Sequence, residues 1–561
     1  MTTLLASPTW PASLPILVTS FTVYLIFKRY EPERVAVASF LLAGVPAGVV
    51  YIVRAHFTTF LGAVLTTFIS FWSLIVAFTI AYRLSPLHPL AKYPGPLLCK
   101  ISNGWIAFVA SRGKAHIYVN ELHKKYNSDI IRTGPNEVSV TNEGIASAVL
   151  GPKGLPRGPY YQTRIHEAGT SLDGLRDQAL HTVRRRPWAR GMNTTSMKYY
   201  EELVKSTVTD LTTAFRQREG EVVDISQWMT FFGFDFMGHM AFTYDYKMLK
   251  NGYDIHKLNH LIEQALSEAA WISHLPWSLP FLSYLPGATK SWDEMKVVGE
   301  ATVEARVAAG SKEKDLFYHL IDEEGLEPVR PSLELCATDG QLAVIAGSDT
   351  AATALSHLWY FLLTQPKYLT RLRDEVDKAY PHGADPIADL TNQANMPYLN
   401  ACINEALRLY PPVLTGLQRR VEEGSGGKMV GPYFIPEGTQ VSPWGYAVHR
   451  DPQHYSPIPD AFWPERWLVQ DNYTLPTGDT ISKDAVVTNR DVFISFSLGP
   501  MVCVGKNVAM MEMRAVMCAV LHQYDVVVAD RSRFDSYENE ICEIFTTKRG
   551  TLPVYLKPRG V

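Results

Sequence analysis

Three apolar runs without charged residues lie at the beginning of the chain. The first 27 residues carry no charge and are mainly apolar from residue 11 to residue 27, and residues 35–53 and 57–82 form two more such runs. Each run is close to the ~20 residues that a helix needs to cross a bilayer. The pattern predicts a membrane anchor over residues 1–84 with up to three transmembrane helices, at about 11–27, 35–53 and 57–82.

Basic residues flank these runs unevenly. Three of them lie between the first and second runs, only Arg54 and His56 separate the second from the third, and Arg83 and Lys92 follow the third. Because cytoplasmic loops carry the excess of Lys and Arg, the chain after residue 82 is predicted on the cytoplasmic side. A cleaved signal peptide for the first run, and an interfacial or re-entrant pair for the other two, are the alternatives.

A proline-rich segment follows the anchor and precedes a long domain. Prolines crowd residues 86–96, and this density favours a semi-rigid spacer over a helix. We therefore place a linker at residues 85–97 and a catalytic domain at 98–561. The chain of 561 residues exceeds the limit of about 250–300 residues for a single core, which predicts several domains or one very large one.

Hydrophobic periodicity in this domain is mainly helical. From about residue 105 to residue 380 the pattern predicts helices, interrupted by short β-like pieces at 130–132 and 137–141. Residues 333–364 are long enough for one long helix, and residues 398–410 form another before two prolines end it. The expected fold class is mainly α with small β-sheets.

Charge and cysteine usage exclude several classes. The net charge is −3 and the sequence pI is about 6.6, so the chain shows no nucleic-acid footprint. The six cysteines are scattered without C-x-x-C pairs, at Cys99, Cys336, Cys402, Cys503, Cys518 and Cys542. This spacing indicates neither a zinc site nor a secreted disulfide framework.

The most informative stretch, residues 496–505, reads F-S-L-G-P-M-V-C-V-G. Gly499 and Gly505 allow the backbone to turn tightly and to approach a flat cofactor. Cys503 lies near the start of a predicted helix, whose dipole favours an anionic sulfur. A thiolate that binds haem iron favours cleavage of a bound O–O bond. The alternative is a buried structural cysteine.

The predicted long helix contains A-G-S-D-T at residues 346–350. Gly347 and Ser348 are poor residues for the middle of a helix, so we expect the hydrogen-bond ladder to open there and to expose a groove. A carboxylate and a hydroxyl beside that groove, Asp349 and Thr350, could relay protons to a bound oxygen.

Two further clusters combine charges. His181 and Arg185 are four residues apart, hence on one helix face, and could hold carboxylates such as haem propionates, unless they belong to a solvated face. Glu405 and Arg408 share another face, and Arg466 follows in F-W-P-E-R-W. An exposed Glu–Arg pair contributes at most about 1 kcal/mol, whereas breaking a buried network costs roughly 3–5 kcal/mol.

Taken in this order, the motifs resemble the haem-thiolate monooxygenases of the cytochrome P450 superfamily. The phrase G-P-M-V-C-V-G-K-N is similar to fungal, membrane-anchored members, and the resemblance runs from Pro86 to the C-terminus. It implies a cytochrome P450 fold with haem b held between two helices.

The resemblance also implies a role for each motif residue. Cys503 would be the axial ligand of the haem iron, Phe496 would pack against the ligand loop, and Gly499 and Gly505 would shape it. Thr350 would donate a hydrogen bond to bound oxygen and Asp349 would help to deliver protons. His181, Arg185 and Arg419, with Arg420 as the neighbouring alternative to Arg419, would hold the propionates, and Glu405, Arg408 and Arg466 would form the structural triad of the family.

One position departs from the family. Arginine or histidine usually stands two residues before the cysteine and pairs with a propionate, but this chain has Met501. A thioether carries no charge and donates no hydrogen bond. An interaction of about 1.5–3 kcal/mol is therefore missing, and we expect His181, Arg185 and Arg419 to hold the propionates.

The expected function is insertion of one oxygen atom from O2 into a hydrophobic small molecule of secondary metabolism, by hydroxylation or epoxidation. By the resemblance, electrons come from NADPH through a membrane-bound cytochrome P450 reductase, with cytochrome b5 as a further candidate partner, at the cytoplasmic face of the endoplasmic reticulum membrane. Lys506 is a candidate basic contact for the reductase. The apolar residues that flank the motifs suggest a terpenoid, polyketide or fatty-acid derivative: Val344, Ile345, Val413, Leu414 and Leu417.

Two rival functions stay open at this point. A haem-thiolate isomerase or dehydratase would act on hydroperoxides without O2 or a reductase, and Thr350 argues against it. A non-catalytic membrane protein or transporter would be built on the three apolar runs, and the long chain beyond them argues against that.

Overall fold

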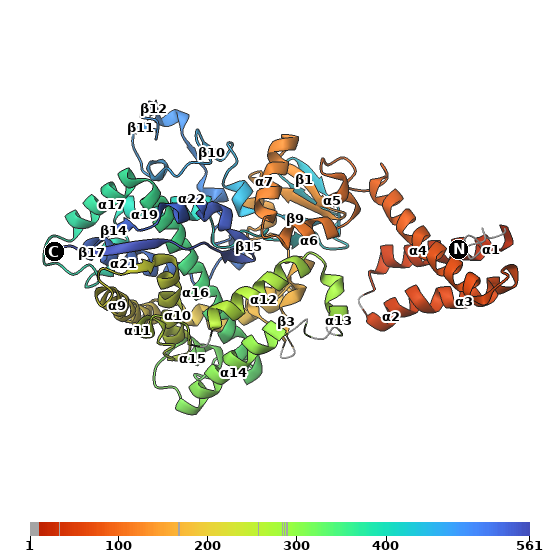
Figure 1. The fold of residues 1–561 in the computed structure, drawn as a ribbon, viewed down its shortest axis with the longest axis horizontal. Helices are drawn as coiled ribbons and strands as arrows, with labels where there is room; N and C mark the ends of the chain where they lie inside the picture. Colours follow the sequence, from red (N-terminus) through yellow and green to blue (C-terminus); the bar gives the residue numbers. More distant parts are fainter. Residues whose placement is uncertain are drawn as a thin grey trace.

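The computed structural model describes residues 10–32, 34–166, 169–255, 257–282, 284, 287 and 290–560. The first nine residues of the predicted anchor lie outside this part. Helices make up most of the molecule and seven small sheets complete it within the described residues (Figure 1). The predicted fold class, mainly α with small β-sheets and N-terminal apolar helices, is confirmed.

The N-terminal helices form a bundle that projects from the side of the main body (Figure 1). Three helical stretches are long and apolar enough to cross a membrane: Ala12–Tyr30, Val35–His56 and Phe60–Leu84. They belong to α1 (Trp10–Tyr30), to the continuous run of α2 (Val35–Ser39), a π-helical turn (Phe40–Gly44) and α3 (Val45–Val53), and to α4 (Phe60–Leu84). Ile16, Val49 and Phe71 pack in the core of this bundle.

The bundle is joined to the main body by specific contacts. Arg83, in the last turn of α4, donates a hydrogen bond of 2.6 Å from Nη1 to the carbonyl of Ile101. Arg132 in turn donates to the carbonyl of Arg83 at 3.2 Å. Leu90 and Tyr93, in the proline-rich segment predicted as a spacer, are buried in the core beside the first sheet. This segment is therefore packed against the main body.

The largest sheet lies next to the anchor and has the order β1-β2-β9-β6. Its strands are β1 (Ile130–Gly134), β2 (Glu137–Val140), β9 (Gln440–Ser442) and β6 (Arg419–Arg420); β2 and β9 are parallel and the other pairs are antiparallel. A three-stranded antiparallel sheet lies at the opposite end, with β14 (Tyr524–Val528), β17 (Pro553–Pro558) and β5 (Val222–Asp224). The remaining strands pair as β3 (Ile165–His166) with β4 (Gly169–Thr170), β7 (Lys428–Val430) with β8 (Tyr433–Ile435), β10 (Tyr455–Ser456) with β13 (Val487–Thr488), β11 (Asn472–Thr474) with β12 (Thr480–Ser482), and β15 (Cys542–Ile544) with β16 (Thr546–Lys548).

A 32-residue helix, α16 (Leu333–Thr364), runs through the main body and has the bounds that the sequence predicts. It packs along α10 (Ile225–Phe242), whose aromatic side chains are buried. The two backbones approach closely at Gly233, where an added Cβ would lie 2.6 Å from the carbonyl oxygen of Ser348. Glycine at this position thus permits the contact.

The break predicted at Gly347 and Ser348 is wrong, because α16 is continuous there. Ser348 Oγ donates to the carbonyl of Val344 at 2.6 Å, one turn earlier, so its hydroxyl is satisfied without opening the ladder. Gly347 faces Met237 of α10, and an added Cβ would collide with the Met237 sulfur. The glycine serves packing between the helices.

The other helices surround this pair. They are α5 (Leu97–Ile101), α6 (Gly104–Ala110), α7 (Ala115–Tyr126), α8 (Gln178–Gly191), α9 (Thr194–Arg216), α11 (Met248–Asn251), α12 (Leu258–Ile272), α13 (Leu279–Leu282), α14 (Lys290–Ala309), α15 (Leu316–Leu320), α17 (Pro366–Ala379), α18 (Leu390–Gln393), α19 (Pro397–Leu409), α20 (Gly445–Val448), α21 (Lys506–Gln523) and α22 (Arg531–Glu540).

Candidate active site

The cysteine loop is a tight turn that leads into α21. The backbone N–H of Cys503 donates to the carbonyl of Phe496 at 2.8 Å and closes the loop. Gly499 has φ +62°, and a Cβ there would collide with the carbonyl of Leu150. Only glycine meets both conditions, since L-residues with a side chain rarely adopt this conformation.

The thiol of Cys503 is accessible although many atoms of the chain surround it. The side chain is exposed by surface area, yet burial raises the pKa of its thiol, while the N–H of Gly505 and the charges of Arg185 and Lys506 act in the opposite direction. Beside it, a Cβ on Gly505 would meet no atom within 4 Å. A thiol that is both accessible and deep, with open space next to it, is what an axial ligand of a flat cofactor requires.

On α16, the two predicted catalytic residues have different surroundings. Thr350 is partly exposed beside the exposed Ala346, and its Oγ1 donates to the Ala346 carbonyl at 2.6 Å. Asp349 is buried, and its Oδ1 lies 3.0 Å from Nη1 of Arg549. Arg549 also donates to Thr353 at 2.6 Å, and to the hydroxyl of a threonine on α10. The Asp349 carboxylate is thus held in an ion pair between α10 and α16.

Sequence reasoning missed Arg549. It follows β16, 200 residues after Asp349, and no local motif surrounds it. Only the packing of the β15–β16 hairpin beside α16 brings the two charges together.

Basic side chains converge from three elements. His181 and Arg185 lie on α8, Arg419 on β6, and Arg157 in the loop that precedes α8. Burial, together with the charges of Arg157, Arg185 and Arg419, lowers the pKa of His181 to about 4. Sequence reasoning missed Arg157 as well, because it lies in a non-helical stretch without a periodic partner.

Two of the predicted propionate ligands, Arg185 and Arg419, donate to backbone carbonyls. Arg185 donates from Nη2 to the carbonyl of Val502, next to Cys503, at 2.7 Å. Arg419 is buried, whereas its neighbour Arg420 pairs with the exposed Glu423 at 2.9 Å. Of the two adjacent arginines, Arg419 is therefore the one that points inward.

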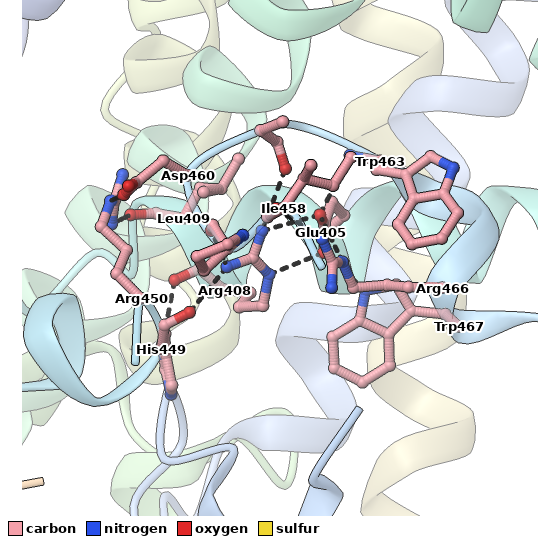
Figure 2. A network of polar contacts seen from close by, with 12 residues as sticks. Glu405, Arg408, Leu409, His449, Arg450, Ile458, Asp460, Trp463, Arg466 and Trp467 are labelled. Carbon is pink, nitrogen blue, oxygen red and sulfur yellow. Dashed lines mark hydrogen bonds and ion pairs between the residues drawn. The ribbon is translucent and has the colours of Figure 1, made fainter. Parts of the chain in front are cut away.

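The charges of Glu405, Arg408 and Arg466 meet in one buried network (Figure 2). Glu405 accepts from Nε and Nη2 of Arg408, both at 2.8 Å, and from Nε of Arg466 at 3.1 Å. The indole of Trp467 and the backbone N–H of Trp463 complete its acceptor sites at 2.8 Å and 3.0 Å. Burial alone would raise the pKa of Glu405, but the two guanidinium groups hold it below its usual value.

The five apolar residues predicted near the substrate do not lie together on one wall. Val344 and Ile345 line a crevice between α10, α12, α14 and α16. Leu414 is fully buried in the main core, and Leu417 packs against the core beside the first sheet. Val413 is partly buried. Their contact with substrate stays a prediction.

Residues 94–553 match the family model of cytochrome P450. The chain belongs to this family. Among its curated relatives, cytochrome P450 monooxygenase nodW of Hypoxylon pulicicidum is 34% identical over 82% of this chain and 81% of the relative. Cytochrome P450 67 of Uromyces fabae is 30% identical over 92% and 93%. The trichothecene C-15 hydroxylase of Fusarium sporotrichioides is 30% identical over 84% and 94%.

A solved structure gives the same fold. The crystal structure of the cytochrome P450DA heme domain aligns with a TM-score of 0.64 and 17% identity over 80% of this chain and 94% of that chain. By its family model and its curated relatives this P450 is a monooxygenase, and the family implies haem. The accessible thiol, the open space at Gly505 and the convergent basic side chains fit that group.

Proposed function

We propose that this P450 inserts one oxygen atom from O2 into a hydrophobic small molecule of fungal secondary metabolism, by hydroxylation or epoxidation. Electrons would come from NADPH through a membrane-bound cytochrome P450 reductase, with cytochrome b5 as a further candidate. The observation that carries the proposal is the thiol of Cys503, which is accessible by surface area although it lies deep, with the charge of Arg185 beside it.

We assign separate roles to Cys503, Thr350 and Asp349. Cys503 would hold the iron, and the haem, when bound, supplies the activation of O2 that a thiolate ligand favours. The hydroxyl of Thr350, on the partly exposed face of α16, donates to the Ala346 carbonyl, and we assign it the transfer of a proton on that side of the helix. Asp349 holds a carboxylate whose position is set by Arg549, and we assign it the delivery of protons to that side of α16.

The same arrangement suggests where partners would bind. Three apolar helices would place the protein in a lipid bilayer, with the catalytic domain on the cytoplasmic face of the endoplasmic reticulum. The exposed Lys506 lies at the start of α21, three residues after the ligand cysteine, and its Nζ is 5.6 Å from the ring of Phe496. A reductase that presents acidic residues would contact this basic side chain.

The proposal is tested in microsomes that contain the protein and a reductase. A reduced, CO-bound spectrum should show the red-shifted Soret band of a thiolate ligand, Cys503→Ser should abolish it, and Cys542→Ser, a control on the β15 strand, should retain it. Untargeted metabolite comparison with Cys503→Ser then identifies the substrate. Turnover that is independent of NADPH and reductase, with hydroperoxide as the sole oxidant, would instead indicate an isomerase or dehydratase.

A further inference from the structure

Glu543, the middle residue of β15, carries a carboxyl group into the interior of the protein. The residue is fully buried, and its backbone N–H donates to the carbonyl of Gly113 at 2.8 Å. Burial raises the pKa of the carboxyl to about 7, against the opposing effects of the Phe545 N–H and the Thr415 hydroxyl. Among the described residues, no cationic side chain acts on this carboxyl group. Glu543 is therefore a buried acid without a counter-ion.

The two oxygens of this carboxyl group have different surroundings. Oε1 accepts a hydrogen bond of 3.1 Å from the N–H of Phe545, at the tip of the hairpin, where φ is +86°. Because an L-residue with a side chain rarely adopts this conformation, the bond has a structural role and helps to hold the tip. Oε2, in contrast, is buried and has no hydrogen-bond partner within the described part of the chain. The shape of the hairpin explains one oxygen of Glu543 and leaves the other unexplained.

Three more buried polar side chains lie in sequence beside Glu543. The hydroxyl of Thr415 lies next to the carboxyl group, and its Oγ1 donates to the Tyr160 hydroxyl at 3.3 Å. The ring of Tyr160 is 5.2 Å from the ring of His274, measured between centroids. His274 follows α12 and is 4% exposed, and neither of its ring nitrogens has a hydrogen-bond partner among the described residues. We call Glu543, Thr415, Tyr160 and His274 the acceptor cluster.

The chemistry of the acceptor cluster suits a cation. Burial lowers the pKa of His274 to about 4, so its imidazole is neutral and keeps one acceptor nitrogen. The carboxyl group of Glu543 adds acceptor oxygens, and the hydroxyls of Thr415 and Tyr160 can accept as well. Most buried polar atoms find a partner in the protein or in ordered water, so unpaired atoms on two neighbouring side chains indicate a bound group. An ammonium group would supply both the missing donors and the missing charge.

The acceptor cluster is connected to both groups of residues that we assign to the reaction. Arg549, which holds Asp349 of α16 at 3.0 Å, directly follows the hairpin that carries Glu543. On the other side, the ring of Tyr160 is 5.7 Å from that of Tyr161, and Tyr161 interacts with the guanidinium group of Arg419. The cluster thus belongs to the same part of the molecule as the candidate active site.

We propose that the acceptor cluster binds a protonated amine of the substrate, with Glu543 as its counter-ion. The inference rests on the proposed function and narrows its substrate class: the hydrophobic molecule carries a basic nitrogen. The ammonium group would donate to Oε2 of Glu543 and to the acceptor nitrogen of His274, while oxidation takes place elsewhere in the molecule. An uncharged alcohol, or a water molecule alone, on Oε2 is the alternative.

Two series of imidazole probes test this with the detergent-purified, full-length holoenzyme. In 1-(ω-aminoalkyl)imidazoles and 1-alkylimidazoles of matched length, the imidazole binds the haem iron and shifts the Soret band, and the chain ends in an ammonium or a methyl group. At the length that reaches the cluster, the amine should bind about ten- to a hundred-fold more tightly than the methyl probe, as expected for one charged hydrogen bond. Glu543→Gln should abolish this preference. Glu263→Gln, which removes the partner of Lys548 on the same hairpin at 3.4 Å, is the matched control and should keep it.

Glutamine keeps an oxygen that can accept from the Phe545 N–H, so the variant separates the charge of Glu543 from its role in the hairpin. A wild type that shows no preference for the amine at any length, or a preference that survives in Glu543→Gln, would overturn the inference. If Glu543→Gln does not accumulate as folded protein, the substrate found by metabolite comparison decides, because one without a basic nitrogen refutes the inference. A wild-type protein without the thiolate Soret band would instead remove the proposed function, and this inference with it.

Discussion

Replacing Glu405 by glutamine is the sharpest perturbation of the buried charge network. The carboxylate accepts five hydrogen bonds, which come from Arg408, Arg466, Trp463 and Trp467. The side chains of the three charged residues are fully buried. Glutamine keeps the shape but removes the charge, and it turns one acceptor into a donor that faces guanidinium donors.

The expected cost follows from this geometry. Two buried guanidinium groups lose their shared counter-ion, and breaking a buried pair in this way costs roughly 3–5 kcal/mol. For a domain of about 460 residues, an unfolding entropy of about 2.1 cal/mol/K per residue amounts to about 1 kcal/mol/K. The melting temperature of Glu405→Gln should therefore fall by about 3–5 °C.

Melting is followed by far-UV circular dichroism and by the Soret absorbance of the purified holoenzyme. Glu423→Gln is the control, because Glu423 is 71% exposed and pairs with Arg420 at the surface, so the melting temperature of this variant should change by less than about 1 °C. Equal shifts for both variants would refute the reasoning. Replacing Glu405, Arg408 and Arg466 together by apolar residues of similar volume should cost less than Glu405→Gln alone, since no unpaired charge is then left.

Three more predictions follow from individual contacts. Gly233→Ala should lower stability by about 1–3 kcal/mol, because its methyl group meets the rigid backbone of α16; Gly347→Ala, which meets a flexible methionine, should cost less in the same melting assay. His449 is buried, which lowers its pKa to about 3, and its Nε2 accepts a backbone hydrogen bond. Below pH ~6.5 this histidine binds a proton in the unfolded chain but not in the folded one. The wild type should therefore lose about 2 kcal/mol more stability than His449→Gln between pH 7 and pH 5. Arg549→Gln should release Asp349 and lower the product formed per NADPH consumed, with the haem-loss rate unchanged; unchanged coupling would contradict a role for the pair in proton delivery.

The sequence predicts those features that depend only on neighbouring residues, such as the ends of a helix and the residues that share one of its faces. The bounds of α16 follow from a long apolar run between Ser332, which caps it, and a proline soon after its end. Glu405 and Arg408 share a helix face by spacing alone. The sequence does not say whether their network is exposed or buried, since this depends on the loop that supplies Arg466.

The failures have physical causes of another kind. Gly347 suggests a helix break because glycine is a poor helix former. In the fold, however, the missing side chain leaves the space that Met237 of α10 occupies. Arg157 and Arg549 acquire their significance only from strands and hairpins that pair across hundreds of positions. No periodicity within either segment indicates which charge it will meet.

The contacts between α4 and the main body change how the anchor should be regarded. A domain on a single flexible tether can swivel above a bilayer, but here Arg83 and Arg132 tie the end of α4 to the body, and the proline-rich segment is packed beneath it. If the anchor spans the bilayer, these contacts fix the tilt of the domain and its height above the lipid. Substrates dissolved in the membrane and a partner diffusing along its surface would then always meet the same edges of the enzyme.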